Sequence, residues 1–299
     1  MTTLIDAQAN LRTLRDVLRY AVTRFNEAEL AYGHGQADAF EEAAFLVMRT
    51  LKLPSERLEF FADAYLTHAE MHELLQVIDR RIKKRLPAAY LLNEAWLRGY
   101  KFYVDERVIV PRSYIGELLD EGLTPWVQDR AAVGDVLDMC TGSGCLAIMA
   151  ADVFPNAKVD AADVSADALQ VARRNVADYQ LEQRVNLVKS DLFGALGTKR
   201  YDLIVCNPPY VTEAAMAKLP AEYGHEPKLA LAGGADGMNL VKTLVRQARG
   251  HLKRGGMLIV EVGGGRAAAE KIFGDLALTW LTTSAGDDMV FLARQEELP

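Results

Sequence analysis

A short loop with two glycines is the first feature of this sequence that could bind a ligand: Asp138-Met139-Cys140-Thr141-Gly142-Ser143-Gly144. Apolar residues predict a strand before the loop and a helix after it. Glycines let the backbone approach a ligand closely, and the first turn of a helix offers N–H groups that the helix itself leaves unpaired. We therefore expect a cofactor-binding turn, although Gly142 to Ala147 also fits the G-x-G-x-x-A pattern of dinucleotide-binding proteins.

Two acidic residues follow at positions where they could bind an adenosine-containing cofactor. Asp163 lies 19 residues after Gly144, at the end of the next predicted strand, where a carboxylate can accept hydrogen bonds from both ribose hydroxyls. Asp191 follows the third predicted strand and could meet the adenine edge. Structural roles stay open for both, because Asp163 could be a turn or cap acid ahead of Ser165 and Asp191 could be an ordinary loop acid.

The segment Asn207-Pro208-Pro209-Tyr210 follows an apolar stretch that predicts a strand over residues 201–206. The two prolines fix φ and remove backbone donors, so this corner is rigid and its carbonyls can only accept hydrogen bonds. The motif resembles that of S-adenosylmethionine-dependent methyltransferases acting on planar nitrogens, which are amide side chains or the exocyclic amines of adenine and cytosine. A purely structural turn is the alternative, and the upstream glycine loop and Asp163 make it less favoured.

The elements that must position these residues alternate between strand and helix after residue 130. Such alternation predicts a mostly parallel sheet covered by helices on both faces. The last two strands, 278–283 and 289–293, are separated by residues 285–288 and predict a terminal hairpin. The other elements expected are strands 136–139, 159–162, 185–188, 201–206 and 257–262, and helices 146–153, 167–179 and 240–252.

The first hundred residues differ in composition from the rest of the chain, because they contain only three of the 22 glycines and two of the ten prolines. Apolar residues at three- and four-residue spacing predict amphipathic helices there. Residues 96–104, around Arg98-Gly99, predict a hairpin that joins two domains, and a strand is expected over 107–110. The apolar stripes are Leu11, Leu14, Leu18, Val22 and Phe25, then Leu74, Val77, Ile78 and Ile82.

Composition excludes several classes of protein. The 299 residues carry a formal charge of −7, of which residues 101–299 contribute −6 (21 basic against 27 acidic), so electrostatics do not favour a DNA-binding protein. Three cysteines are too few for a disulfide framework, and no paired Cys or His spacing indicates a metal site. We expect a cytoplasmic protein, because we find neither a signal peptide nor a membrane span.

A basic run, Arg80, Arg81, Lys83, Lys84 and Arg85, closes the predicted helical region. It could be a nucleic-acid patch. We expect instead a solvated helix face, with cations near a helix C-terminus that the helix dipole favours.

Further segments carry a family pattern, namely Ala88-Ala89-Tyr90-Leu91, Trp96, Gly99, Phe102-Tyr103-Val104, Val110-Pro111-Arg112, His225-Glu226-Pro227 and Gly233 to Gly237. Together with residues 135–263, they resemble the bacterial protein-glutamine methyltransferases over essentially the whole chain. That family has a branch that modifies peptide release factors and a branch that modifies the third protein of the large ribosomal subunit. Residues 112–117 and 138–145 resemble the ribosomal-protein branch, which is expected to have proline and arginine where Tyr114 and Gly224 stand here.

The resemblance implies an α/β fold of the class I, Rossmann-like methyltransferase type, with a mostly parallel sheet ending in an antiparallel hairpin. A small helical substrate-recognition domain is expected over residues 1–88, a linking hairpin over 89–112, and the methyltransferase domain over 113–299. The implied cofactor is S-adenosylmethionine, with S-adenosylhomocysteine as its product. The implied partner is a basic ribosomal protein, with no stable nucleic acid, no membrane and no metal.

The resemblance also implies the residues that perform methyl transfer. The Asn207 side-chain oxygen and the Pro208 carbonyl would accept both N–H bonds of a glutamine amide and aim its lone pair at the methyl group, while Tyr210 packs on the amide. The cysteines would be small packing residues, with Cys140 also beside the cofactor. Cofactor contacts are expected from Asp138, Cys140, Thr141, Gly142, Gly144, Asp163, Val164, Asp191, Leu192 and Asn207, and substrate contacts from Asn207, Pro208, Pro209, Tyr210, Arg112 and Glu226.

Other functions remain open at this point. A release-factor methyltransferase would use the same chemistry, and so would a DNA amino-methyltransferase, which usually adds a basic cleft and a target-recognition domain. A nicotinamide dehydrogenase would use the Gly142 loop and leave Asn207 to Tyr210 unexplained. A non-catalytic ribosome-assembly factor would bind RNA through Arg80 to Arg85.

Overall fold

The computed structural model describes residues 4–299 and divides them into two units. One unit is the chain through Glu94 together with the short segment Pro220–His225, and the other is Ala95–Leu219 with Glu226–Pro299. The chain thus passes from the second unit to the first at Pro220 and returns to the second unit after His225.

The first unit is a set of helices whose starts are fixed by their own sequences. Thr13 begins one helix and Thr67 another, each with a capping box in which the threonine hydroxyl and an acid three residues later satisfy each other's backbone N–H groups. The predicted apolar stripes pack into one core, with Leu14, Phe25 and Ile78 almost fully buried. The helices are α1 (Leu4–Asn10), α2 (Leu14–Glu27), α3 (Ala39–Thr50), α4 (Leu58–Phe61), α5 (His68–Lys84) and α6 (Ala88–Leu92).

The basic run at the end of α5 is not the uniform solvated face that we predicted. Arg81 is 0% exposed and donates to Glu42 Oε1 at 2.6 Å and to the Ala31 carbonyl at 3.0 Å. Its burial follows from its position, because it stands three residues after the buried Ile78 on the same helix face. Arg81 Nη1 lies 3.4 Å and Arg85 Nη2 lies 3.0 Å from the buried Glu222 carboxylate, so both arginines bind the segment Pro220–His225.

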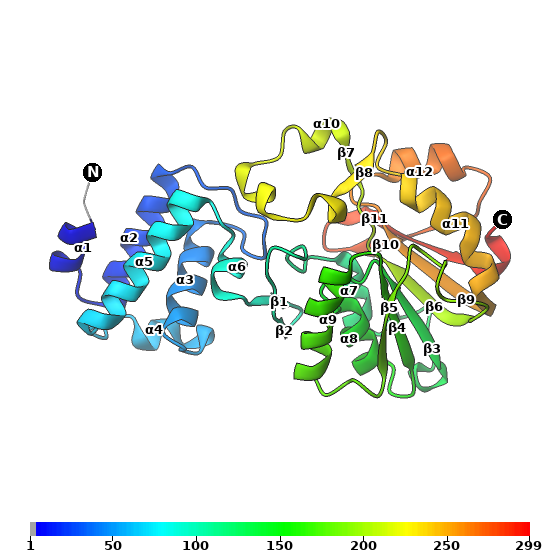
Figure 1. Cartoon of the computed structure of the whole chain (residues 1–299), viewed down its shortest axis with the longest axis horizontal. Coiled ribbons are helices and arrows are strands. Elements are labelled where there is room, and N and C mark those ends of the chain that lie inside the picture. The colour runs from blue at the N-terminus through cyan, green and yellow to red at the C-terminus, as the bar shows by residue number, and fades with distance from the viewer. Residues whose placement is uncertain (1–3) are drawn as a thin grey trace. The chain divides into compact units, whose positions relative to one another are not determined.

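The second unit is built on a seven-stranded sheet in the order β10-β11-β9-β6-β3-β4-β5. Five neighbouring strands are parallel, β11 runs antiparallel to β9, and β10 pairs antiparallel with β11, which gives the terminal hairpin that the sequence predicted. Figure 1 shows α7, α8 and α9 on one face of the sheet and α11 and α12 on the other. The strands are β3 (Asp135–Met139), β4 (Lys158–Asp163), β5 (Val185–Lys189), β6 (Tyr201–Cys206), β9 (Leu252–Glu261), β10 (Thr279–Thr283) and β11 (Gly286–Arg294).

Smaller elements surround this sheet. The hairpin of β1 (Ala95–Leu97) and β2 (Tyr100–Phe102) turns at Arg98 and Gly99, both with positive φ, which suits a tight two-residue turn. A two-stranded parallel sheet of β7 (Val211–Thr212) and β8 (Ala232–Gly234) was not foreseen. The helices are α7 (Tyr114–Asp120), α8 (Cys145–Val153), α9 (Ala166–Asp178), α10 (Glu213–Met216), α11 (Asn239–His251) and α12 (Arg266–Phe273).

Two local predictions are wrong. Residues 107–110 form no strand, because their backbone donors have other partners: Val108 N–H donates to the Asp105 carbonyl and Val110 N–H to the Glu226 side chain. The turn expected over residues 285–288 is shorter than predicted, because Gly286 already pairs with Thr283 and begins β11.

Candidate active site

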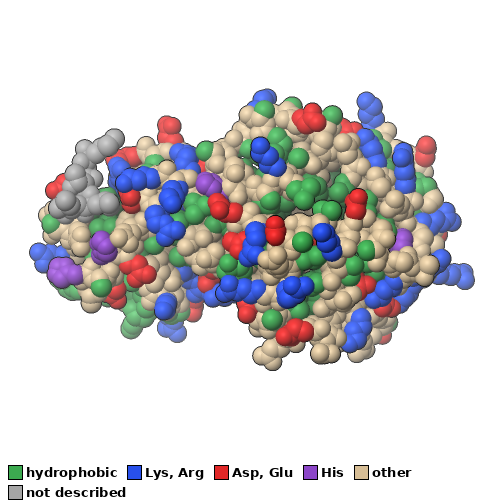
Figure 2. Space-filling model, viewed as in Figure 1, with side chains coloured by type: hydrophobic (Ala, Val, Ile, Leu, Met, Phe, Trp, Pro, Cys, Tyr) green, Lys and Arg blue, Asp and Glu red, His purple; other side chains and the backbone are tan. Residues whose placement is uncertain are grey.

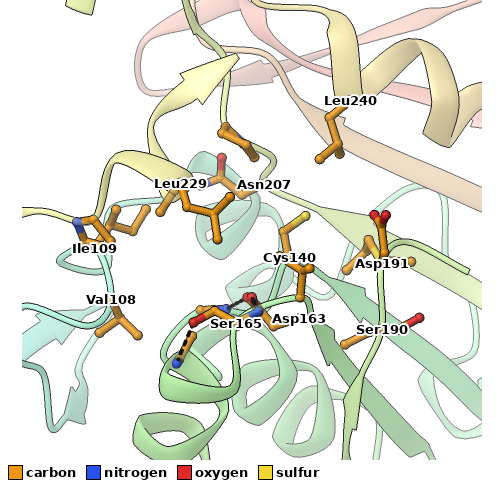
Figure 3. A pocket seen from close by; sticks show the side chains of 18 of the residues that line it. Val108, Ile109, Cys140, Asp163, Ser165, Ser190, Asp191, Asn207, Leu229 and Leu240 are labelled. Atoms are coloured by element: carbon orange, nitrogen blue, oxygen red, sulfur yellow. Dashed lines mark hydrogen bonds between the residues drawn. The ribbon is translucent and has the colours of Figure 1, made fainter. Parts of the chain in front are cut away.

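A pocket opens at the carboxyl ends of β3, β4, β5 and β6. This edge is where parallel α/β sheets bind their ligands, because the loops after the strands converge there. Figure 3 shows Asp163 and Ser165 on one side of the pocket, Asp191 on another, and Asn207 near Leu229 across from Asp163. The lining residues predicted from the sequence are Cys140, Gly142, Asp163, Val164, Asp191, Leu192, Asn207 and Pro209.

The glycine loop is held in place by a buried carboxylate. Asp138 Oδ2 accepts hydrogen bonds from the Thr141 hydroxyl at 2.5 Å and from the Ala147 N–H in the first turn of α8 at 3.0 Å. Both loop glycines have positive φ, 54° at Gly142 and 82° at Gly144, a conformation that other residues rarely adopt. Burial raises the pKa of Asp138 to about 7, and its Oδ1 has no hydrogen-bond partner within residues 4–299.

Asp163 has the structural role that the sequence left open, and it also lies in the pocket wall. Its Oδ1 accepts the Ser165 N–H at 2.8 Å and its Oδ2 accepts the Gly142 N–H at 2.9 Å, so it braces both the following turn and the glycine loop. It also lines the pocket, and each oxygen has a second lone pair that a ligand hydroxyl could use. Burial raises the pKa of this carboxyl above its usual value.

The rest of the pocket wall is largely apolar. Val164 is 47% exposed, an unusual state for a valine next to a buried strand, and Leu192 lines the pocket with it. Cys140 and Leu192 have positive φ although neither is glycine, and such strained residues concentrate at binding sites. Cys145 and Cys206 are buried, in keeping with their predicted packing role.

The corner after β6 is packed tightly by glycines. A Cβ on Gly237 would lie 2.4 Å from the Tyr210 carbonyl oxygen, and one on Gly233 would lie 2.7 Å from the Tyr210 Cα. A Cβ on Gly263 would lie 2.6 Å from the Tyr210 ring. These three glycines therefore give Tyr210 its place, while Asn207 and Pro209 face the pocket and Pro208 is buried.

Arg112 and Glu226 bind each other in the structure. Two guanidinium nitrogens of Arg112 donate to the two carboxylate oxygens of Glu226, each at 2.5 Å, and Glu226 also accepts the Val110 N–H at 3.0 Å. Neither charged side chain lines the pocket. Ile109, which precedes Val110, and Pro227, which follows Glu226, do line it. The pair therefore fixes two walls of the pocket relative to each other.

The structure brings together only part of the predicted set. The predicted residues that do not line the pocket are Asp138, Thr141, Gly144, Pro208, Tyr210, Arg112 and Glu226. Sequence reasoning missed several apolar lining residues, because nothing distinguishes them from core residues before the fold is known; they are Val108, Ile109, Leu229, Ala230 and Leu240. Glu261, which accepts hydrogen bonds from Ser113 and Tyr210, was also missed, since it lies inside an apolar strand pattern.

Neither a metal centre nor a membrane span is found in the described part of the chain. Within residues 4–299, no three His, Cys, Asp or Glu side chains gather where they could hold a metal ion. No helix in that range is long and apolar enough to cross a membrane.

A family model matches part of this chain, and relatives of known name match nearly all of it. The family model described as Methyltransferase small domain matches residues 119–222. "Ribosomal protein uL3 glutamine methyltransferase" of Burkholderia pseudomallei is 56% identical over 295 residues, 96% of this chain and 96% of the relative. The protein of that name from Neisseria meningitidis serogroup A is 52% identical over 98% of this chain and 96% of its own length. Among solved structures, a methyltransferase from Pyrococcus furiosus is 21% identical with a TM-score of 0.47, covering 67% of this chain and 90% of that one.

Proposed function

This chain belongs to the ribosomal protein uL3 glutamine methyltransferase family, and we propose that it transfers a methyl group from S-adenosylmethionine to the side-chain amide nitrogen of a glutamine in uL3. One observation of the structure carries the proposal beyond the family relationship. Asn207, the first residue of the acceptor-rich corner after β6, lines the same pocket as Asp163 and Gly142 of the glycine loop. A methyl donor held by the loop and Asp163 would therefore lie next to acceptors suited to an amide.

The pocket residues fit the chemistry of an adenosyl cofactor. Asp163 offers carboxylate oxygens with spare lone pairs to the ribose hydroxyls, and Asp191 offers an acceptor to the adenine edge. Val164 and Leu192 present apolar surface suited to a flat aromatic base. Cys140 and Gly142 bring the loop backbone to the pocket, while Asp138, Thr141 and Gly144 hold that loop from behind.

When bound, S-adenosylmethionine would supply an electrophilic methyl group to the amide nitrogen, and S-adenosylhomocysteine and one proton would be released. Glutamine nitrogen is a poor nucleophile, because its lone pair is delocalised into the carbonyl. The Asn207 side-chain oxygen and the Pro208 carbonyl would accept its two N–H groups and favour the pyramidal form. Such fixed acceptors also stabilise the positive charge that develops on nitrogen.

Charge favours a basic protein substrate. Residues 101–299 carry a formal charge of −6, which would attract a positively charged ribosomal protein during encounter, and this attraction would weaken as salt rises. On the face drawn in Figure 2, acidic and basic side chains are interspersed. We propose that the enzyme works in the cytoplasm on uL3 that is not yet fully assembled, because a glutamine buried against ribosomal RNA could not reach the pocket.

The test of this function is methyl transfer in a ribosome-free extract with a labelled methyl donor. Labelling of uL3 on a glutamine, identified by mass spectrometry, is the expected result. Labelling of a release factor in place of uL3 would contradict the assignment of uL3 as the substrate. Labelling of nucleic acid would contradict the proposal that a glutamine amide is methylated. Asn207→Ala serves as the control and should lower the labelling rate about 10²–10³-fold.

A further inference from the structure

A buried carboxylate lies behind the catalytic corner and outside the pocket. Glu261 is the last residue of β9, next to β6 in the sheet, and is 0% exposed. Its Oε2 accepts hydrogen bonds from the Ser113 hydroxyl at 2.6 Å and from the Tyr114 N–H at 2.8 Å. Its Oε1 accepts the Tyr210 hydroxyl at 3.3 Å.

These contacts join the corner to a second segment of the methyltransferase unit. Ser113 caps α7, accepting the Ile115 N–H at 3.2 Å while it donates to Glu261, so one carboxylate fixes both the start of α7 and the Tyr210 hydroxyl. The backbone of Tyr210 is already confined by Gly233 and Gly237. Gly263 packs against the Tyr210 ring, and the hydroxyl contact adds the hydrogen bond that, together with this packing, fixes the tilt of the ring.

We infer that Glu261 is a positioning residue for methyl transfer, which acts by holding the Tyr210 ring in the orientation that packs on the amide. This inference rests on the proposed function, since it assigns Tyr210 to the amide site. Burying a charge costs several kcal/mol, and the three hydrogen bonds from Ser113, Tyr114 and Tyr210 offset that cost at this strand end.

The surroundings of Glu261 also predict a pH dependence. Burial raises its pKa to about 7. Two titratable groups face Glu261 and Tyr210, namely Tyr114 on α7 and Arg112. Arg112 lowers the pKa of Tyr210, whereas burial and Glu261 raise it. On β11 the residue paired with Glu261 is the uncharged Val290. Protonation would weaken the bonds from Ser113, Tyr114 and Tyr210, so the methyl-transfer rate falls as the pH drops through about 7.

The experiment measures single-turnover methyl transfer from pH 6 to pH 9 on a purified substrate, with cofactor affinity determined by calorimetry for each variant. We expect Glu261→Gln to slow transfer about 10- to 100-fold at pH 8, with cofactor affinity within about two-fold. The fall in rate near pH 7 should become smaller in this variant, and what remains is assigned to Asp138, whose pKa burial also raises to about 7. Tyr210→Phe should give a similar defect, and the double variant should be no slower than the slower single variant, because both changes remove one interaction.

A matched control is available on the same sheet. Tyr201 donates to the buried Asp160 at 2.7 Å, and neither residue lines the pocket, so Asp160→Asn removes a tyrosine–carboxylate pair without touching the corner. We expect this variant to lose stability while its single-turnover rate stays within about two-fold.

The outcomes separate this inference from the proposed function. A wild-type enzyme that fails to label uL3 contradicts the proposed function, and the ratios are then measured on whichever substrate it does label. A Glu261→Gln rate within two-fold of wild type, multiplicative effects in the double variant, or an unchanged pH profile would each overturn the role of Glu261.

Discussion

Replacement of Asp163 by alanine is expected to weaken cofactor binding more than any other single change in the pocket. Two charge-assisted hydrogen bonds to a ribose are worth about 1.5–3 kcal/mol each. Their loss corresponds to roughly a 10²–10⁴-fold rise in the cofactor Kd. The same oxygens also hold the Gly142 and Ser165 N–H groups at 2.9 and 2.8 Å, so the variant should lose some stability even without cofactor.

Titration calorimetry on the folded variant measures the affinity, and thermal unfolding measures the loss of stability. Asp160→Asn, on the same strand and outside the pocket, is the matched control and should bind cofactor normally. Because burial raises the pKa of Asp163, wild-type affinity should also fall as acid protonates this carboxyl, at a pH above the usual value for aspartate. An unchanged Kd in folded Asp163→Ala would remove this residue from the cofactor site.

Three further changes test other parts of the structure. Asn207→Ala should bind cofactor nearly normally and lose about 10²–10³-fold in single-turnover methyl transfer; a loss of only a few-fold would exclude its amide-binding role. Arg112→Ala leaves the buried Glu226 carboxylate without its guanidinium, so we expect a loss of about 3–5 kcal/mol in unfolding free energy by denaturant titration, whereas a loss below about 1 kcal/mol would show that the pair contributes little. Arg81→Met should destabilise by a similar amount, since Glu42 then stays buried without its partner, and calorimetric unfolding at neutral pH would reveal an unaltered Tm if this is wrong.

The sheet could be predicted because its residues follow simple periodic rules. Short apolar runs separated by helical patterns gave the order of strands and helices, and β6 was predicted with its observed bounds. The same reasoning misplaced residues 107–110, whose β-branched pattern resembles a strand although the Val110 N–H donates to Glu226 more than a hundred residues away. A long-range side-chain contact of this kind leaves no local signal.

The polar part of the site was also more predictable than its packing. Asp163 and Asn207 stand at strand ends, where chemistry is expected, and both line the pocket. The burial of Arg81 and the contact between Glu261 and Tyr210 depend on partners from distant segments, so charge alone suggested a solvated face for the first and gave no signal for the second.

The central claim is tested most directly by comparing methyl incorporation into three purified substrates: free uL3, intact large ribosomal subunits and a release factor, each at low and moderate salt. We predict that free uL3 is labelled fastest, on a glutamine side chain, with a rate advantage that shrinks as salt rises because the attraction to the acidic enzyme is screened. Intact subunits should be poor substrates. Labelling of a release factor as fast as uL3, or faster, would contradict the assignment of uL3 as the substrate.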